Sequence, residues 1–350
     1  MFNKVRIAKK ISVVSDMENL LTVRNLQTAF TTDGREVISV EDVSFSLKPG
    51  EVLGIVGESG CGKSVTSSSI MRLLGKKGRV RQGEILFEGT NLLELSDDQL
   101  RDIRGNQIAM IFQEPMTSLN PVFTIGYQMT EAIHLHLHLS KKEERDYAIN
   151  MLNKVGIPRA EAIFDSYPHT LSGGMRQRVM IAIALSCNPK LLIADEPTTA
   201  LDVTIQAQIL DLMKKLCKAS NMAVMLITHD LGVIAEMADR VIVMYAGQVM
   251  EEADVFTLFD HPKHPYTQGL MKSIPQIDVA EGERLVSIPG TVPTAYQMVQ
   301  GCRFHTRCAF ATEQCRQEVP ALMDAGQNHW ARCWHIEEEA SPLLRGVACG

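Results

Sequence analysis

The sequence lacks the features that mark membrane-spanning, exported and nucleic-acid-binding proteins. No apolar run approaches the roughly 18 residues of a membrane-spanning helix, so we expect no such helix. No continuous apolar segment follows the basic N-terminal residues Lys4, Arg6, Lys9 and Lys10, which argues against a secretory signal. The net charge of −6 and the pI near 6.0 argue against a nucleic-acid partner.

The cysteine content has a related consequence. Eight cysteines lie in a chain of 350 residues that shows no export signal, so we expect free thiols or a metal site rather than structural disulfides.

The length fits one large or two ordinary domains, and no internal repeat is visible. Ordered sequence is expected to start near Met17, so residues 1–16 are interpreted as a disordered extension or an early start codon.

The most informative segment of the chain is the run GESGCGKS, which fits G-x-x-x-x-G-K-[ST]. Residues 51–56 before it predict an apolar strand, and residues 65–74 after it predict a helix. A glycine-rich turn between strand and helix lets backbone N–H groups surround phosphate oxygens. Lys63 would reach the β- and γ-phosphates, and the Ser64 hydroxyl would bind Mg²⁺. The alternative is a chance glycine-rich turn. The predicted phosphate-binding residues are Gly57, Glu58, Ser59, Gly60, Cys61, Gly62, Lys63 and Ser64.

The order of predicted elements indicates an α/β fold built on a parallel sheet. Short apolar runs at 107–112, 190–194 and 222–228 are typical of buried parallel strands. A helical stretch at 203–219 separates the last two runs, and residues 121–187 are helical in pattern. β-like runs with a turn at Asp33-Gly34 precede the phosphate loop, and another strand is expected at 83–87. The pattern therefore predicts a parallel α/β sheet with a helical insertion.

Polar side chains follow three of the predicted strands. Asp195 and Glu196 end one strand, His229 follows the next, and Gln113 ends the run at 107–112. Because ligands of open α/β sheets bind at this strand edge, we expect Asp195 to hold Mg²⁺ beside Ser64. Glu196 is placed to activate a water molecule against the γ-phosphate. The alternatives are a solvated acidic pair at a strand end, a structural histidine and an uninvolved glutamine.

A second glycine-containing turn precedes a helix at Leu171-Ser172-Gly173-Gly174-Met175. The N–H groups at such a helix start can bind an anion. The alternative is an ordinary helix N-cap with a flexible turn.

Together these motifs resemble the ATPase subunits of ABC transporters, over residues 19–260. Residues 57–64 look like the family's phosphate loop, Gln113 like its Q-loop glutamine, and His229 like its switch histidine. Residues 171–175 resemble the LSGGQ signature, with Met175 in place of the usual glutamine, and residues 191–196 the second Walker motif. Ala200, Leu201 and Asp202 resemble the D-loop, and Phe30 is the candidate for the aromatic residue that stacks on adenine.

The resemblance implies a composite site in which two such domains pack head to tail around ATP. The catalytic residues would be Glu196, His229 and Gln113, with Mg²⁺ held through Ser64, Gln113 and Asp195. Ser172 would contact only the ATP of a second ATPase subunit. In the peptide-importer branch of the family, described next, that subunit is usually a different chain. Closure on ATP would be transmitted through the Q-loop and the helical region to the membrane subunits.

Residues 261–270 (HPKHPYTQGL) and 113–121 resemble the dipeptide/oligopeptide and nickel importer ATPases. That branch implies two membrane permease subunits, a separate peptide-binding protein, and a location at the cytoplasmic face of the inner membrane. The expected fold is a P-loop ABC-type nucleotide-binding domain with a β-subdomain and a helical subdomain, and a loop-rich cysteine-containing extension. The expected boundaries are 17–260 for the ATPase, about 115–187 for its helical subdomain, 261–340 for the extension and 341–350 for the tail end.

Three functions follow from these observations. The first is ATP-driven import of dipeptides or oligopeptides, with nickel or another small solute as the alternative cargo. A soluble ABC ATPase acting on DNA would need a heptad-bearing insertion, and one acting on ribosomes a second motif set; the sequence has neither. A non-hydrolysing regulatory subunit would be expected to lack Glu196 or His229, and both are present.

Four cysteines in the extension are spaced C-x5-C-x6-C-x17-C, at Cys302, Cys308, Cys315 and Cys333. Four thiolates in a loop-rich segment can hold a metal centre. Relatives of this branch include proteins with a [4Fe–4S] cluster here, so the resemblance implies a cluster, with Zn²⁺ or unliganded thiols as the alternatives.

Overall fold

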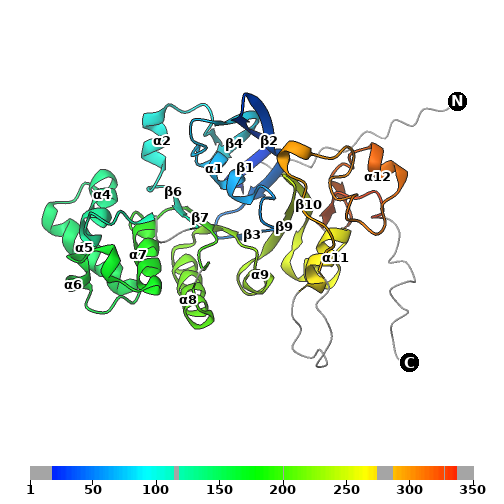
Figure 1. The fold of residues 1–350 in the computed structure, drawn as a ribbon. Helices are drawn as coiled ribbons and strands as arrows, with labels where there is room; N and C mark the ends of the chain where they lie inside the picture. The colour runs from blue at the N-terminus through cyan, green and yellow to red at the C-terminus, as the bar shows by residue number, and fades with distance from the viewer. Residues whose placement is uncertain (1–17, 114–117, 200, 274–286, 327, 337–350) are drawn as a thin grey trace, which may run out of the picture.

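The structure of the protein is a computed structural model that describes residues 18–113, 118–199, 201–273, 287–326 and 328–336. Two sheets lie at its centre, a group of helices forms one end, and the C-terminal segments pack at the opposite end (Figure 1). The α/β fold predicted from the sequence is therefore confirmed.

The larger sheet has eight strands in the order β11-β12-β10-β9-β3-β8-β7-β6. The last five strands in this order are parallel: β9 (Arg240–Tyr245), β3 (Val52–Val56), β8 (Ala223–Ile227), β7 (Leu191–Asp195) and the edge strand β6 (Ile108–Ile111). The strands predicted at 51–56, 107–112, 190–194 and 222–228 are confirmed as β3, β6, β7 and β8. β10 (Gln248–Asp254), β12 (Trp330–Ala331) and β11 (Met323–Asp324) extend the sheet in antiparallel fashion.

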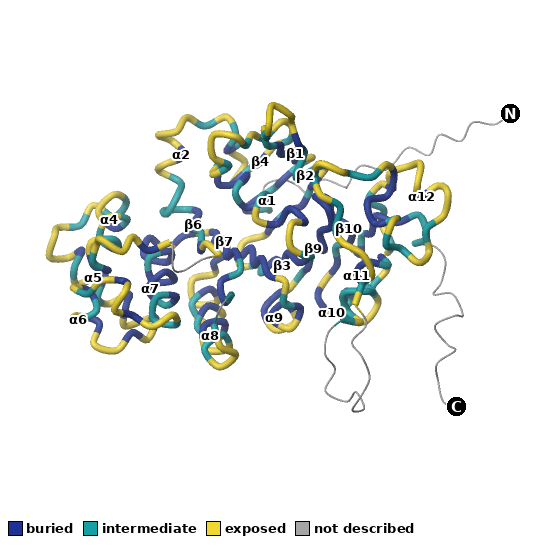
Figure 2. Tube along the Cα trace, in the orientation of Figure 1, coloured by how far each residue is buried: buried dark blue, intermediate teal, exposed yellow. Residues whose placement is uncertain are grey.

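Apart from Arg240 at the start of β9 and Asp195 at the end of β7, the parallel strands are apolar, because both faces of the sheet are covered. Along β7, Leu191 and Ile193 belong to the core between the two sheets, whereas Leu192 and Ala194 belong to the core under the helices. Side chains alternate between the two faces of a strand, so a strand buried on both sides needs an unbroken apolar run. Figure 2 shows these strands as the continuous buried centre of the molecule.

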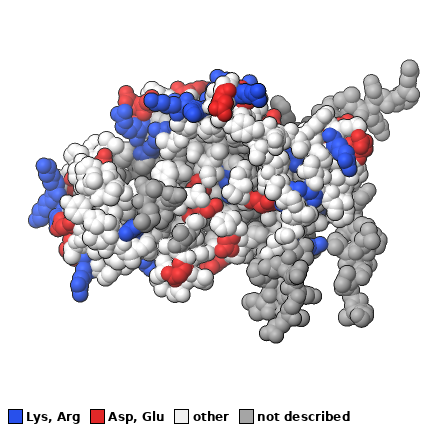
Figure 3. All heavy atoms as spheres, in the orientation of Figure 1, with Lys and Arg blue, Asp and Glu red and all other residues white. Residues whose placement is uncertain are grey.

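The smaller sheet is antiparallel, in the order β2-β1-β4-β5. Its strands are β2 (Arg35–Leu47), β1 (Leu21–Thr32), β4 (Gly78–Phe87) and β5 (Thr90–Asn91). Asp33 and Gly34 join β1 to β2 with φ values of 51° and 72°, the left-handed pair that a two-residue hairpin turn requires. Lys and Arg are interspersed with Asp and Glu along this upper edge of the molecule (Figure 3).

Helices cover both faces of the larger sheet. α1 (Lys63–Ile70) follows β3, and α2 (Asp97–Ile103) precedes β6, with Ser96 as its N-cap. α7 (Gly173–Leu185), α8 (Val203–Ser220) and α9 (Leu231–Met237) pack on the opposite core. The helical end of the molecule is formed around α7 by α4 (Ile125–Leu137), α5 (Lys141–Lys154), α6 (Ala160–Phe164) and the short η2 (Pro168–Thr170).

The C-terminal part is attached to the larger sheet itself. Its regular elements are α10 (Val255–Asp260), α11 (Pro265–Lys272), η3 (Ala295–Gln297), α12 (Glu313–Gln317) and the strands β11 and β12. β12 pairs with β10, and Tyr266 and Phe304 belong to the core under the helices. This part is loop-rich, as expected from the sequence. The strands that it adds to the larger sheet, and the core that it shares with that sheet, were not predicted.

Two predicted boundaries near the phosphate loop are wrong. The helix expected at 65–74 spans Lys63–Ile70, because the chain turns after Met71 and reaches a left-handed Gly75. The strand expected from Gly83 begins at Gly78, and Gly83 lies within it at φ 108°. A Cβ at Gly83 would lie 2.6 Å from the Arg24 carbonyl oxygen, next to the register shift between β1 and β4. Gly83 therefore marks a β-bulge rather than a strand end.

This geometry predicts that Gly83→Ala lowers the free energy of unfolding by about 1–3 kcal/mol, because φ is left-handed and the backbone of β1 blocks the new methyl group. Gly89→Ala is the matched control, since Gly89 also has a positive φ of 79° but no atom within 4 Å of its added Cβ. Thermal unfolding of both variants should show the larger fall in Tm for Gly83→Ala. Equal falls would contradict the role of the β1 contact.

Candidate active site

A cavity of about 200 Å³ lies where β3 and β7 end. It brings together the phosphate loop, the Q-loop glutamine and Glu196, three regions far apart in the sequence. Its lining is formed by Ser39, Ser59, Gly60, Cys61, Gly62, Lys63, Ser64, Val65, Gln113, Glu196, Ala246, Pro293, Ala295 and Met298.

The phosphate loop folds tightly at the end of β3. Gly57, Gly60 and Gly62 have φ values of 150°, 79° and 104°, and a Cβ on Gly57 would lie 2.2 Å from the Met244 carbonyl oxygen. Nζ of Lys63 donates hydrogen bonds to the carbonyl oxygens of Gly57 at 2.7 Å and Glu58 at 3.2 Å. The ammonium group is therefore held across the loop, at the N-terminus of α1, where a phosphate anion is favoured.

Ser64 and Asp195 meet as the sequence predicted. The Ser64 hydroxyl donates a hydrogen bond of 3.0 Å to Oδ1 of Asp195, although the residues are 131 positions apart. A hydroxyl and a carboxylate at this separation, with the Gln113 amide in the same cavity, supply the oxygen donors that Mg²⁺ prefers. These residues fit the predicted magnesium site.

Glu196 lies at the centre of a polar network. Its carboxylate accepts hydrogen bonds from Nε2 of Gln113 at 3.0 Å and from the Thr199 hydroxyl at 2.8 Å, and Nδ1 of His229 lies 3.3 Å away. Glu196 has φ 48°, a left-handed conformation that is rare for this residue type and concentrates at functional sites. The structure thus joins all three predicted catalytic residues in one network.

The pKa values of the adjacent Asp195 and Glu196 carboxyl groups are shifted in opposite directions. Burial raises the pKa of Asp195, against the lowering effect of the hydrogen bond from Ser64. Burial also acts to raise the pKa of Glu196, but hydrogen bonds from Thr199 and His229 outweigh it and lower the pKa overall. Glu196 is therefore kept ionised, as a proton acceptor must be.

The signature segment, residues 171–175, lies at the start of α7 and outside this cavity. The Ser172 hydroxyl caps α7 by accepting a hydrogen bond of 3.3 Å from the Met175 N–H. A Cβ on Gly174 would lie 2.8 Å from Cγ2 of Ile205, so close packing against α8 requires glycine there. None of Leu171, Ser172, Gly173, Gly174 or Met175 lines the cavity around the phosphate loop in the described part of the chain. This separation is what a site shared between two subunits requires.

Comparisons with known proteins agree with this geometry. The family model described as "ABC transporter" matches residues 40–199, and the one described as "Oligopeptide/dipeptide transporter, C-terminal region" matches residues 250–315. The oligopeptide transport ATP-binding protein AppD of Bacillus subtilis is 54% identical, over 93% of this chain and 99% of its own. The dipeptide transport ATP-binding protein DppD of Escherichia coli is 50% identical, with the same coverage. The chain belongs to the ABC transporter ATPases.

A solved structure shows the same fold. The dimeric, post-hydrolysis ATP-binding cassette MJ0796, bound to ADP and Pi, superimposes with a TM-score of 0.61 at 29% identity. The match covers 67% of this ABC ATPase and 98% of that cassette, so the present chain carries additional residues beyond the shared cassette. No helix in the part of the chain that the structure describes is long and apolar enough to cross a membrane.

Two site predictions have different outcomes. The ring of Phe30 lies close to Gly78 of β4 and does not line this cavity, and its role against adenine stays a prediction. Of the D-loop, Ala200 lies outside the described residues, whereas the Asp202 carboxylate caps α8 by accepting a hydrogen bond of 3.0 Å from the Ile205 N–H. The N–H of Leu201 donates to the Thr198 carbonyl oxygen.

Several contacts to the site were not predicted from the sequence. The buried Gln177 of α7 donates from Nε2 to the carbonyl oxygen of Pro197, which directly follows Glu196. This bond connects the signature helix of the ABC ATPase with its catalytic strand. Gln177 lies between Arg176 and Arg178, so no local pattern in the sequence indicates that its side chain is buried. Thr199 and the cavity residues from the C-terminal part also carried no such signal, because long-range folding alone brings them there.

The predicted cysteine site receives no geometric support. Cys302, Cys315 and Cys333 are buried and Cys308 is half-buried, all as free thiols. Burial raises the pKa of Cys302 to about 11, and charge on the neighbouring Cys315, Cys333 and Cys308 would raise it further. The thiols are therefore neighbours, but among the described residues no group of three Cys, His, Asp or Glu side chains is arranged to hold a metal ion.

Because the hydrogen bond from Thr199 lowers the pKa of Glu196, Thr199→Val should change the pH dependence of ATP hydrolysis. The substitution removes this hydrogen bond and keeps the shape of the Thr199 side chain. The pKa of Glu196 should rise, so protonation should inactivate the variant at higher pH than the wild type. The measurement is kcat for ATP hydrolysis against pH at saturating ATP and Mg²⁺. An acid limb at the wild-type pH would contradict the role of Thr199.

Proposed function

We propose that this chain is the ATP-hydrolysing subunit that energises import of dipeptides or oligopeptides through a membrane ABC transporter. The observation that carries the proposal is the joining of Gln113, Thr199 and His229 to one ionised Glu196 beside the phosphate loop. The cargo class is supported by the relatives AppD and DppD, which are named as oligopeptide and dipeptide transport proteins, and by the match of residues 250–315.

The chemistry follows from the positions of the side chains. Lys63, now held by loop carbonyl oxygens, would transfer its hydrogen bonds to the phosphates of ATP. Ser64, Asp195 and Gln113 would hold Mg²⁺, which neutralises phosphate charge when bound. Glu196 would accept the proton of the attacking water, and His229 would donate a hydrogen bond to the γ-phosphate.

The second half of each site would come from another ATPase subunit. Ser172 and its helix N-terminus lie outside the cavity of their own chain, which supports a head-to-tail pair that sandwiches ATP. Following the resemblance, we propose that the partner is a different chain. In that arrangement the isolated subunit hydrolyses ATP poorly, because its own site lacks the signature serine.

Exposed apolar side chains support docking to membrane subunits. Phe112 directly follows β6, and Val122, Phe123 and Tyr127 lie at the start of the helical end, all at least 40% exposed. The rings of Phe123 and Tyr127 stack with their centroids 4.5 Å apart. Because Phe112 directly precedes Gln113 in the chain, movement at the γ-phosphate can reach this part of the surface. We propose two permease subunits as its partners, with the protein peripheral at the cytoplasmic face of the inner membrane and a separate peptide-binding protein supplying the cargo.

The proposed domain division places residues 17–260 in the ATPase, with the helical subdomain at about 115–187, and residues 261–340 in the importer-type extension. Nickel or another small solute is the alternative cargo within the same branch. This alternative differs in the substrate-binding protein and the permeases, because no residue of the ATP site contacts the cargo.

Deleting the gene and measuring cell uptake of labelled dipeptide, labelled pentapeptide and nickel tests the cargo. We expect peptide uptake to fall to background and nickel uptake to remain. A gene copy carrying Lys63→Ala should fail to restore uptake, whereas a wild-type copy should restore it. Loss of nickel uptake alone would contradict the peptide assignment.

The tail cysteines define a separate proposal, supported by their spacing and by four neighbouring free thiols. We propose that Cys302, Cys308, Cys315 and Cys333 take up a [4Fe–4S] cluster, with Zn²⁺ as the alternative. Anaerobically purified protein should be brown and contain about four iron and four sulfide per chain. Colourless protein with one zinc ion would establish the alternative, and metal-free protein would reject both.

A further inference from the structure

One wall of the nucleotide cavity comes from the C-terminal part of the chain. Pro293, Ala295 and Met298 line it, beside the phosphate loop that is more than 200 positions earlier. These three residues are half-buried, whereas Thr294, Tyr296 and Gln297 between them are exposed. The segment around η3 therefore turns one side to the cavity and the other to solvent.

The position of this wall indicates what part of a nucleotide it meets. Lys63, Ser64 and Glu196 fix the triphosphate at the phosphate-loop end of the cavity. Away from them the lining consists of Ser39 of β2, Ala246, and the three residues of the C-terminal segment. A base and ribose attached to that triphosphate must extend toward these small and apolar side chains.

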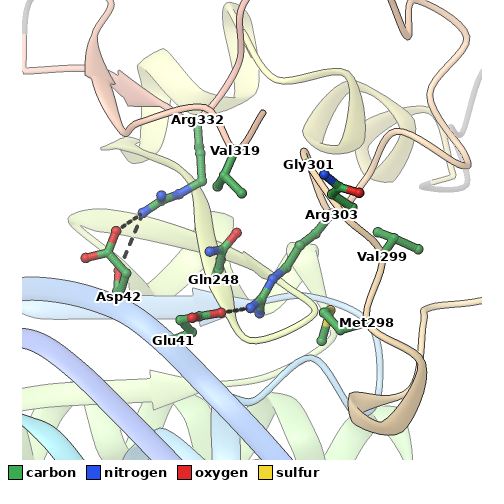
Figure 4. A pocket seen from close by; sticks show the side chains of 10 residues that line it. Glu41, Asp42, Gln248, Met298, Val299, Gly301, Arg303, Val319 and Arg332 are labelled. Carbon is green, nitrogen blue, oxygen red and sulfur yellow. Dashed lines mark hydrogen bonds and ion pairs between the residues drawn. The ribbon is translucent and has the colours of Figure 1, made fainter. Parts of the chain in front are cut away.

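Buried arginines fasten the C-terminal part next to this wall. Arg303 is ion-paired with Glu41, and Arg332 is 3.0 Å from Oδ2 of Asp42, so two guanidinium groups bind two adjacent carboxylates of β2. Figure 4 shows both pairs in a second cavity, which Met298 also lines. Each arginine side chain is only 5% exposed, whereas the carboxylates are partly exposed. Because a buried guanidinium left without its partner is costly, these pairs hold the wall against β2.

The phosphate loop is held by the same part of the chain. Nη1 of Arg307 lies 2.9 Å from Oε1 of Glu58, and the Glu58 N–H donates a hydrogen bond of 2.9 Å to the Tyr266 hydroxyl. The Arg307 side chain is also only 5% exposed. The base-side wall and the phosphate loop are therefore attached to one rigid support.

We propose that the segment 293–298 supplies one wall of the base-and-ribose subsite for ATP, with Ala295 and Met298 as specificity-determining contacts. The proposal rests on the proposed function, since it assumes that the cavity takes ATP. The nucleoside lies against this segment and Ser39, and the triphosphate lies in the phosphate loop.

The test compares two probes, Mg–ATP and Mg–tripolyphosphate, which share the phosphates and differ in the nucleoside. Ala295→Trp fills the space assigned to the nucleoside. By calorimetry it should weaken ATP binding by about tenfold or more, from the cost of overpacking, and leave tripolyphosphate binding at the wild-type level. Ala321→Trp is the matched control, because Ala321 is exposed in the same C-terminal part and lines neither cavity. It should bind both probes like the wild type.

Met298→Ala provides a second variant that removes atoms instead of adding them. It should weaken ATP binding by a smaller factor, again with no change for tripolyphosphate, and its Tm shows whether the fold is retained. Unchanged ATP affinity in both variants would overturn the proposal. An equal loss for both probes would also overturn it, because the segment would then act through the phosphate loop. If instead Lys63→Ala leaves the binding of both probes unchanged, the ATP site itself is refuted.

Discussion

Parallel pairing of β3, β8 and β7 is the constraint on which the site depends. Val52 pairs with Val224 and Leu191 with Ala223, so the three strands run in register and end at one edge of the sheet. That edge brings Ser64 to Asp195 across 131 residues. The N–H of Glu196 continues the pairing by donating a hydrogen bond of 2.8 Å to the Ile227 carbonyl oxygen, at the point where φ becomes positive. The turn directs the carboxylate toward Gln113 and His229.

Neighbouring carboxyl groups at this edge have different chemical roles because their surroundings differ. Asp195 is buried beside the hydroxyls of Ser64 and Ser67, and burial raises its pKa, so a bound cation would offset the cost of its buried charge. Glu196 receives enough hydrogen bonds to stay ionised, which suits a proton acceptor. The environment, rather than the residue type, separates the metal ligand from the base.

Sequence reasoning succeeded where function depends on local order along the chain. The phosphate loop, the Ser172 cap and the strand-end carboxylates each follow from a motif with its own strand or helix, and parallel topology then places them at one edge. It failed where long-range packing decides. Gly83 was taken for a strand end because a bulge depends on the partner strand β1. Pro293, Ala295 and Met298 reach the cavity from more than 200 positions further along the chain, which no local pattern in the sequence indicates.

The central claim is that Glu196 is the base of an ATP hydrolase, and Glu196→Gln tests it most directly. The variant keeps the shape of the side chain and loses its ability to accept a proton. With its partner subunit it should bind Mg–ATP as the wild type does, accumulate as a closed dimer, and hydrolyse ATP about a hundredfold or more slowly. Glu84→Gln, which changes an exposed carboxylate paired with Arg24, is the control. Undiminished hydrolysis by Glu196→Gln would contradict the account.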